Sequence, residues 1–198
     1  MVYWFHAMGG YYSLKDQTLK LKVDIDANRV LVVNTGAEDV FTRFLSEKAV
    51  FVTVEEEFMK MADPRSIRLL MNPVKLTFAP ESFDAAVLFF TFFYLPKHEA
   101  IVENVNRVLK KWGKLFIWDV SIPKKMAHKS FFVVPLLIDT GQELIRTVHI
   151  TKWRREQPVG LVKKITRERG FKVVKEEIYD QIFYLELLKI APAKQHSL

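Results

Sequence analysis

The sequence predicts an α/β fold, a doubly wound and mostly parallel seven-stranded sheet with helices on both faces and a C-terminal antiparallel hairpin. Residues 81–119 have the pattern strand, helix, strand, and the run from Phe83 to Leu95 carries no charge after Asp84. Short apolar runs alternate with helical patterns over most of the chain, and two strand-like runs close it. Strands that alternate with helices are typical of a parallel sheet buried under helices.

The first half of the chain begins with a lead-in segment, residues 1–24, whose pattern allows a short helix over Ser13–Lys20. Four apolar runs after it predict strands. These are Arg29–Asn34, Val50–Val54, Ile67–Met71 and Phe83–Phe90. The helices predicted between the first three strands span Asp39–Lys48 and Glu56–Met61, and Asp63-Pro64 ends the second helix.

The second half begins with a helix that carries one apolar face. That face consists of Ile101, Val102, Val105, Val108 and Leu109. A turn at Trp112-Gly113 then leads into a fifth strand, Leu115–Trp118. The segment Ser121–Gln157 is less regular: Glu143–Trp153 alternates like a strand or hairpin, and we expect the whole segment to form a cap or rim.

The end of the chain predicts a helix followed by a hairpin. Pro158 begins the helix and Gly170 closes it, as proline in the first turn and glycine past the end are expected to do. The hairpin strands are Phe171–Ile178 and Ile182–Ile190, and the tail 192–198 is expected to be loose.

The length and composition predict a single domain. The chain has 198 residues, about half of them hydrophobic, which suits one core. The absence of cysteine excludes disulfides, thiolate metal sites and cysteine nucleophiles. With no apolar run of membrane-spanning length and no signal-peptide pattern at the start, we expect a cytoplasmic protein that does not enter a membrane. Abundant Lys and Glu are compatible with a thermophile source.

The net charge of +7 allows two interpretations. A lysine-rich solvated surface explains it because the charges are spread along the chain. An acidic partner such as RNA also explains it, and the best support is Lys152-Trp153-Arg154-Arg155, where basic side chains flank an aromatic ring.

Several landmarks within residues 81–119 occur in a recognisable order. They are Ser82-Phe83-Asp84-Ala85, Leu95-Pro96, Arg107-Val108-Leu109-Lys110, Gly113 and Asp119. This order resembles the second half of the class I, Rossmann-like S-adenosylmethionine-dependent methyltransferases, and the order of elements extends the resemblance over roughly residues 25–190. The resemblance implies S-adenosylmethionine as cofactor, with S-adenosylhomocysteine as product.

The glycine-rich first motif of that family is degenerate in this chain. Val32 stands at the acidic position, and Asn34, Gly36 and Glu38 stand at the three glycine positions. Asn tolerates a positive φ better than most residues, so Asn34 is a mild departure, whereas Glu38 puts a long charged side chain where bare backbone is usual. The resemblance still assigns the cofactor to the segment Asn34, Thr35, Gly36 and Ala37.

The second motif is better preserved. Glu55, followed by Glu56, matches the acid that accepts hydrogen bonds from the ribose hydroxyls in the family, although it also suits the first turn of a helix. Asn72, followed by Pro73, matches a position near the adenine amino group, where an amide oxygen is a suitable acceptor. Asn72-Pro73 is equally typical of a simple turn.

Two aromatic positions complete the cofactor site that the resemblance implies. Phe89 ends a strand whose backbone carbonyls face the methionine portion in the family, but its side chain also suits the core. Tyr12, or its neighbour Tyr11, resembles the lead-in tyrosine that covers the cofactor in some members.

Other chemistries fit the sequence less well. The five histidines form no close pair at metal-ligand spacing, so no metal site is predicted, and His98 is expected on the surface near a helix start. No Gly-x-Ser-x-Gly elbow supports a hydrolase. Glu38 and Asp39 would repel the pyrophosphate of a dinucleotide but need not exclude S-adenosylmethionine, whose net charge is positive.

The leading hypothesis is therefore methyl transfer to an unidentified acceptor, with a small molecule favoured and nucleic acid possible. Methyl transfer depends mostly on positioning two reactants, so an obligatory catalytic side chain need not exist. Asp119 and Tyr94 are the candidates if a base is required. The alternatives are a non-catalytic binding module with the same fold and an RNA methyltransferase.

Overall fold

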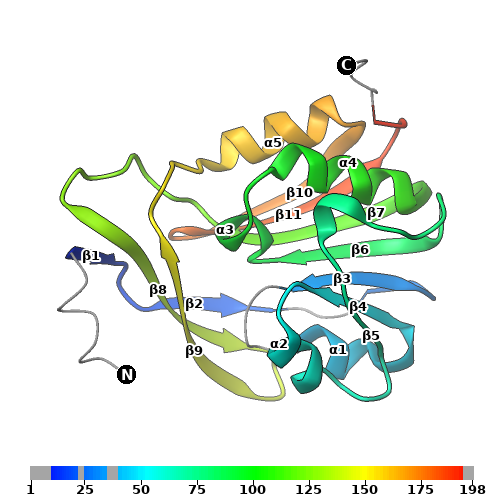
Figure 1. Ribbon diagram of the computed structural model, residues 1–198, viewed down its shortest axis with the longest axis horizontal. Helices are drawn as coiled ribbons and strands as arrows, with labels where there is room; N and C mark the ends of the chain where they lie inside the picture. Colours follow the sequence, from blue (N-terminus) through cyan, green and yellow to red (C-terminus); the bar gives the residue numbers. More distant parts are fainter. Residues whose placement is uncertain (1–9, 22–24, 35–39, 194–198) are drawn as a thin grey trace.

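A computed structural model describes residues 10–21, 25–34 and 40–193 of the chain (Figure 1). Its main feature is a seven-stranded sheet in the order β10-β11-β7-β6-β3-β4-β5. The bounds are β3 Val30–Asn34, β4 Ala49–Thr53, β5 Ile67–Leu70, β6 Phe83–Phe89, β7 Leu109–Val120, β10 Phe171–Tyr179 and β11 Ile182–Lys189. The mostly parallel α/β sheet and the closing hairpin are therefore as predicted.

The strand order reverses between β3 and β6. From β3 the chain moves outward through β4 to β5, then returns to the other side of β3 and continues outward through β6 to β7. These neighbours pair in parallel, whereas β11 pairs antiparallel with both β7 and β10. Ligands of such sheets bind outside the carboxyl ends of the strands, near the point of reversal.

One face of the main sheet is covered by α4, His98–Val108, and α5, Val159–Glu168, which lie side by side (Figure 1). Four apolar residues of α4 on the predicted face are fully buried there. They are Ile101, Val102, Val105 and Val108. They pack on alternate residues of the central strands, such as Leu31 and Leu88. The apolar face of the helix and one face of the sheet thus form a single core.

The other face is covered by α1, Val40–Leu45, and by a second, smaller sheet. That sheet contains the hairpin β8, Lys129–Asp139, and β9, Leu144–Lys152. The strands β1, Gly10–Ser13, and β2, Gln17–Lys20, follow one another along the other edge of β8 and run parallel to it. Helices thus lie on both faces of the main sheet, as predicted. On the face that α1 covers, however, the second sheet is an additional layer that the sequence did not predict.

The lead-in segment is strand where the sequence allowed a helix over Ser13–Lys20, so that prediction was wrong. Gln17–Lys20 alternates between buried and exposed residues, with Leu19 fully buried. A four-residue strand is too short to show its period against flanking polar residues, and its pairing with β8 decides its conformation. Residues 1–9 and 22–24 lie outside the described residues.

The segment Glu143–Trp153, predicted to be a strand or a hairpin, contains the single strand β9, and it pairs with β8 in a hairpin that packs on the sheet. Alternate residues of β8 point inward and are buried in the core. They are Phe132, Val134, Leu136 and Ile138. The hairpin tip reaches α1, where Arg43 forms an ion pair of 3.0 Å with Glu143.

The strand β7 is longer than predicted because the Trp112-Gly113 turn is an irregularity within it. Residues 109 and 114 pair with Phe83 and Ala85, so extra residues bulge from β7 between them. A Cβ on Gly113 would lie 2.9 Å from the carbonyl oxygen of Lys110 and 3.0 Å from that of Asp84. The bulge therefore requires glycine at its closest approach to β6.

The remaining elements lie close to their predicted positions. The helix α2 spans Glu56–Met61 as predicted, and α1 is followed by a 3₁₀ turn, η2, over Ser46–Lys48. A second 3₁₀ turn, η3, spans Pro73–Lys75, and a one-turn helix, α3, spans Thr91–Tyr94. The Pro158 and Gly170 boundaries of α5 are confirmed, and Gly170 has φ of +80°. Within the described ranges, no helix has the length and apolar character needed to cross a membrane.

Candidate functional site

The carboxyl ends of β3, β4 and β6 meet at one edge of the main sheet. Asn34, the last residue of β3, pairs with Phe89, the last residue of β6, and Val33 pairs with Val52 near the end of β4. The structure therefore brings Asn34, Phe89 and the start of the segment after β4 together. The predicted site residues Thr35, Gly36 and Ala37 lie outside the described residues.

Asn34 is buried at this edge, with only 2% of its surface exposed. The neighbouring carbonyl oxygen of Val33 accepts a hydrogen bond of 3.0 Å from Oγ1 of Thr91. This bond ties the end of β3 to the start of α3.

Glu55 stands directly before α2 and its side chain is exposed. Its backbone N–H donates to Oγ1 of Thr53 at 3.2 Å. The adjacent Glu56 pairs with Lys60 one turn later at 2.7 Å, a solvent-exposed contact of little energetic weight. Glu55 thus presents a carboxylate beyond the end of β4, where the resemblance expects a ribose-binding acid.

Asn72 begins η3, and its Oδ1 accepts the backbone N–H of Val74 at 3.0 Å. Pro73 is buried at the first position of that turn. The turn interpretation is therefore confirmed. An amide oxygen accepts two hydrogen bonds, so the assignment of Asn72 to an adenine amino group stays a prediction.

The side chains of Phe89 and Tyr12 both pack among other aromatic rings. Phe89 is fully buried and makes an edge contact with Phe41, with ring centroids 5.4 Å apart. Tyr12, on β1, contacts Phe132 and Trp153, with centroids 5.5 and 5.4 Å apart. A role for the Phe89 carbonyl or for Tyr12 in cofactor binding stays a prediction.

Asp119 is a buried anchor for the segment after β6. Its carboxylate accepts the backbone N–H groups of Phe92 and Val120 at 2.8 Å, that of Phe93 at 3.3 Å, and Nε2 of Gln157 at 3.0 Å. Burial raises the pKa of Asp119 to about 7, against these four donors, which favour the carboxylate. With no exposed surface, Asp119 positions α3 and does not meet an acceptor directly.

Arg155 and His98 form a second buried contact on the same segment. Nη2 of Arg155 lies 2.7 Å from Nε2 of His98 and donates to the carbonyl oxygens of Leu95 at 2.9 Å and Phe92 at 3.3 Å. Because a guanidinium only donates, its contact with Nε2 requires the lone pair of a neutral imidazole. The same Nε2 also lies 3.1 Å from the carbonyl oxygen of Phe92 and 3.0 Å from that of Leu95. Burial, and then the charge of Arg155, lower the pKa of His98 to about 4.

His98 is thus the first residue of α4, as predicted, but it is buried and not on the surface. The sequence does not predict the burial of His98, because its hydrogen-bond partner Arg155 lies far along the chain. Sequence reasoning also missed His149. The imidazole of His149 stacks on Phe90, with centroids 4.1 Å apart, and its Nδ1 lies 3.0 Å from Oη of Tyr94.

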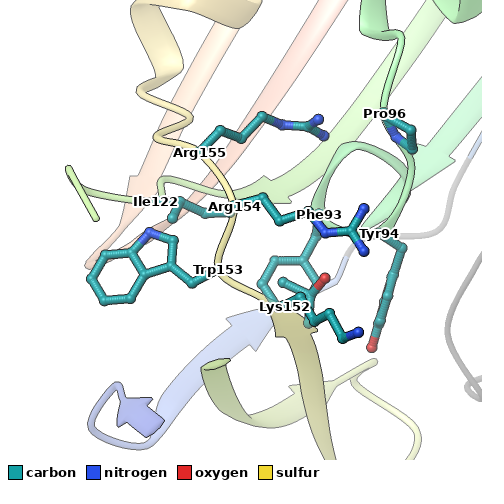
Figure 2. Close-up of a pocket in the computed structure, with 9 residues that line it drawn as sticks. Phe93, Tyr94, Pro96, Ile122, Lys152, Trp153, Arg154 and Arg155 are labelled. Atoms are coloured by element: carbon teal, nitrogen blue, oxygen red, sulfur yellow. The ribbon is translucent and has the colours of Figure 1, made fainter. Parts of the chain in front are cut away.

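A cavity of about 180 Å³ opens between the segment after β6 and the strand end at residues 151–155 (Figure 2). Its walls come from the segments that follow β6 and β7, and from the end of β9 with the residues directly after it. The lining residues are Phe93, Tyr94, Pro96, Ile122, Thr151, Lys152, Trp153, Arg154 and Arg155. It therefore lies at the carboxyl edge of the sheet, next to the segment that Asp119 holds in place.

The basic run noted in the sequence lines this cavity, but Trp153 is only 1% exposed. Its ring lies against Phe132 and Tyr12 and is not available as a stacking surface for nucleic-acid bases. Across the described ranges, no group of three or more His, Asp or Glu side chains is arranged to hold a metal ion.

Comparison with known proteins places this site within a known kind of domain. Residues 33–117 match the family model described as a methyltransferase domain. That range runs from the end of β3 through β6 to β7, so it contains Asn34, Glu55, Asn72 and the α3 segment. No curated protein matches the chain.

Among solved structures, a S-adenosylmethionine-dependent methyltransferase from Methanosarcina mazei has a TM-score of 0.61 and 14% identity, covering 87% of this chain and 99% of its own. A S-adenosylmethionine-dependent methyltransferase from Aquifex aeolicus has a TM-score of 0.56 and 19% identity, covering 81% of both chains. The [4+2]-cyclase SpnF has a TM-score of 0.62 and 14% identity, covering 87% of this chain and 77% of its own. At these identities the likeness concerns the fold alone, and one fold accompanies more than one reaction.

Proposed function

We propose that this chain is a class I S-adenosylmethionine-dependent methyltransferase, which binds S-adenosylmethionine and transfers its methyl group to a small-molecule acceptor. The observation that carries the proposal is the exposed carboxylate of Glu55 at the end of β4, next to the end of β3, within the part of the chain that matches a methyltransferase domain. When bound, S-adenosylmethionine supplies a sulfonium methyl group for transfer to a nucleophilic atom of the acceptor.

The residues present fit that cofactor. Glu55 would accept hydrogen bonds from the ribose hydroxyls, which are charge-assisted and therefore strong. Asn72 would accept one from the adenine amino group through the remaining capacity of Oδ1. Glu55, Glu56 and Glu57 form an acidic group beside the site, which suits a cofactor of net positive charge.

Other parts of the edge would complete the cofactor site. The backbone of Asn34 to Ala37 and the carbonyl of Phe89 would hold the methionine portion, and Tyr12 is proposed to cover it from the lead-in strand. Asn34, in place of the family's first glycine, is the last residue of β3 and does not have a positive φ, so this position does not need glycine for its backbone conformation.

The cavity beside Tyr94 is the proposed acceptor site. It adjoins α3, and Thr91 of α3 is bonded to the end of β3, so an acceptor there would lie next to the proposed cofactor site. Tyr94 lines the cavity and contacts His149 through its hydroxyl oxygen. We propose this pair as the group that takes up a proton where the acceptor must lose one.

Calorimetry with S-adenosylmethionine and S-adenosylhomocysteine tests the proposal directly. We expect both ligands to bind with micromolar dissociation constants and to raise the unfolding temperature. If neither ligand binds at millimolar concentration, the enzyme proposal fails.

A non-catalytic or differently reacting module is the second candidate. Asn34 and Glu38 at two glycine positions favour it, and the similar fold of a [4+2]-cyclase shows what such a scaffold can carry in another protein. Cofactor binding without methyl transfer to any acceptor would support this candidate. An RNA acceptor, the third candidate, predicts binding that weakens steeply with salt. A cytoplasmic location is part of the proposal for all three.

A further inference from the structure

The acceptor cavity carries an unusual balance of charge. Three of its lining residues are cationic, namely Lys152, Arg154 and Arg155, and none of the nine is acidic. Its remaining walls include the rings of Phe93 and Tyr94. Figure 2 shows Lys152 and Arg154 extending from the same strand end toward Tyr94, on the opposite wall.

Two of the three cationic side chains, those of Lys152 and Arg154, form no ion pair within the described residues. Among residues 10–21, 25–34 and 40–193, no acidic side chain lies within ion-pair distance of Lys152 or Arg154, and both side chains are exposed. Arg155 is different because its Nη2 is engaged by two carbonyl oxygens and His98. Lys152 and Arg154 therefore offer their donors to a ligand, while Arg155 holds the opposite wall.

The cations are also mutually repulsive. Burial lowers the pKa of Arg155, the charges of Asp119 and Glu99 raise it, and the adjacent charge of Arg154 lowers it. An anion in the cavity would relieve this repulsion, and it would meet arginine's planar set of donors, which suits carboxylate and phosphate oxygens.

We propose that the cavity binds the methyl acceptor through an anionic group, a carboxylate or a phosphate, held by Lys152 and Arg154 while the body of the acceptor lies against Phe93 and Tyr94. The inference rests on the proposed function, since it gives a chemical class to that acceptor. The volume of about 180 Å³ is large enough for a small ring or a short chain. The buried Trp153 offers no base-stacking surface.

The test uses the full chain and three probes with the same phenyl ring, of which benzoate and benzamide match in shape and differ in charge. Benzoate, phenyl phosphate and neutral benzamide are titrated by calorimetry and by chemical-shift perturbation in NMR. We expect one of the anions to bind about tenfold or more tightly than benzamide, and the stronger anion identifies carboxylate or phosphate. Equal binding of benzamide and both anions overturns the inference.

Variants of the cavity residues test whether the preference for anions arises in this cavity. Arg154→Gln and Lys152→Gln should each weaken anion binding about tenfold and leave benzamide unchanged. Arg146→Gln is the control, because Arg146 lies on the same strand β9 with 78% of its side chain exposed and does not line the cavity. Unfolding temperatures within error of the parent exclude misfolding as the cause. If Arg154→Gln binds the anions as tightly as the parent, the inference is overturned.

Two further outcomes separate this inference from the proposed function. Binding of S-adenosylmethionine without any preference for anions overturns the inference and leaves the proposed function standing. Selective anion binding without any binding of S-adenosylmethionine supports the anion site but overturns the proposed function. If a short single-stranded RNA binds with Arg154 dependence while benzoate and phenyl phosphate do not, the inference is overturned in favour of nucleic acid.

Discussion

Oη of Tyr94 lies 3.0 Å from Nδ1 of His149, which joins the segment after β6 to the second sheet. The stacking of His149 on Phe90 reinforces the same junction. Since Tyr94 lines the cavity and His149 lies on β9, this contact fixes the distance between two cavity walls. The second sheet therefore shapes the proposed acceptor site as well as covering the core.

A double-mutant cycle measures this junction. Tyr94→Phe removes the hydroxyl and His149→Phe keeps an aromatic ring on Phe90, and we expect a coupling free energy of about 1 kcal/mol between them. Urea unfolding of the parent, both single variants and the double variant gives the value. Tyr184→Phe is the control partner because its hydroxyl contacts Glu186, and its coupling to His149 should be near zero. A Tyr94–His149 coupling within error of zero contradicts the prediction.

The neutral imidazole of His98 predicts a pH-dependent stability. Its pKa falls from 6.5 to about 4 on folding, mainly through burial and then through Arg155. Between these pH values the unfolded chain binds the proton and the folded chain does not, so acidification from pH 6.5 to 4 favours unfolding. Below pH 4 both states are protonated and the effect stops growing.

The measurement is the difference in unfolding free energy between the parent and His98→Gln across this pH range, which cancels groups common to both. The parent should lose on the order of 3 kcal/mol relative to the variant as the pH falls from 6.5 to 4. Asp119 titrates identically in both proteins and does not enter the difference. A difference that is constant across the range would show that His98 is not buried as a neutral base.

The exposed carboxylate of Glu55 predicts a loss of cofactor affinity on substitution. Glu55→Ala should weaken binding of S-adenosylhomocysteine by about 1–3 kcal/mol, because two ribose hydroxyls lose a charged acceptor. Calorimetry checks the value. Glu168→Ala, at the end of α5 with 52% of its side chain exposed and outside the proposed site, is the control and should change affinity by less than about 0.5 kcal/mol. An unchanged affinity in Glu55→Ala would remove this residue from the site.

The two ends of α5 predict opposite responses to the same substitution. At Gly170, φ is +80° and a Cβ would collide with the carbonyl oxygen of Ala191, so Gly170→Ala should cost about 3 kcal/mol or more. At Gly160, a Cβ meets no atom within 4 Å, so Gly160→Ala should stabilise by about 0.5–1 kcal/mol. Urea unfolding gives the free energy of unfolding of both variants. Equal changes in the two variants would contradict the prediction that only Gly170 requires glycine.

The main sheet was predictable because its signals are local. The uncharged run in β6 and the apolar face of α4 each lie within one element, and Pro158 and Gly170 mark helix ends by their own backbone limits. The second sheet was not predictable in this way. Its strands β1 and β2 are four residues each, and their conformation depends on pairing with β8 far along the chain.

The candidate site likewise contains some residues that local sequence signals predict and others whose role depends on the fold. Glu55 and Asn72 could be found because they follow strands directly, although Asn72 proved to cap a turn. The basic run at residues 152–155 was visible, but its function was not. Only the fold separates exposed Arg154 from Arg155, which is committed to backbone carbonyls, and both from the buried ring of Trp153.

The pairing of β1 and β2 with β8 has a consequence for biosynthesis. Both N-terminal strands leave the ribosome before any strand of the main sheet, yet the edge that receives them is made only after β7. During elongation their backbone groups stay available to wrong partners, including other nascent chains. The second sheet, and with it one wall of the cavity, is therefore completed at a late stage of translation. A nascent chain that stalls before β8 would contain the methyltransferase-domain match but lack the strand end that carries Lys152 and Arg154.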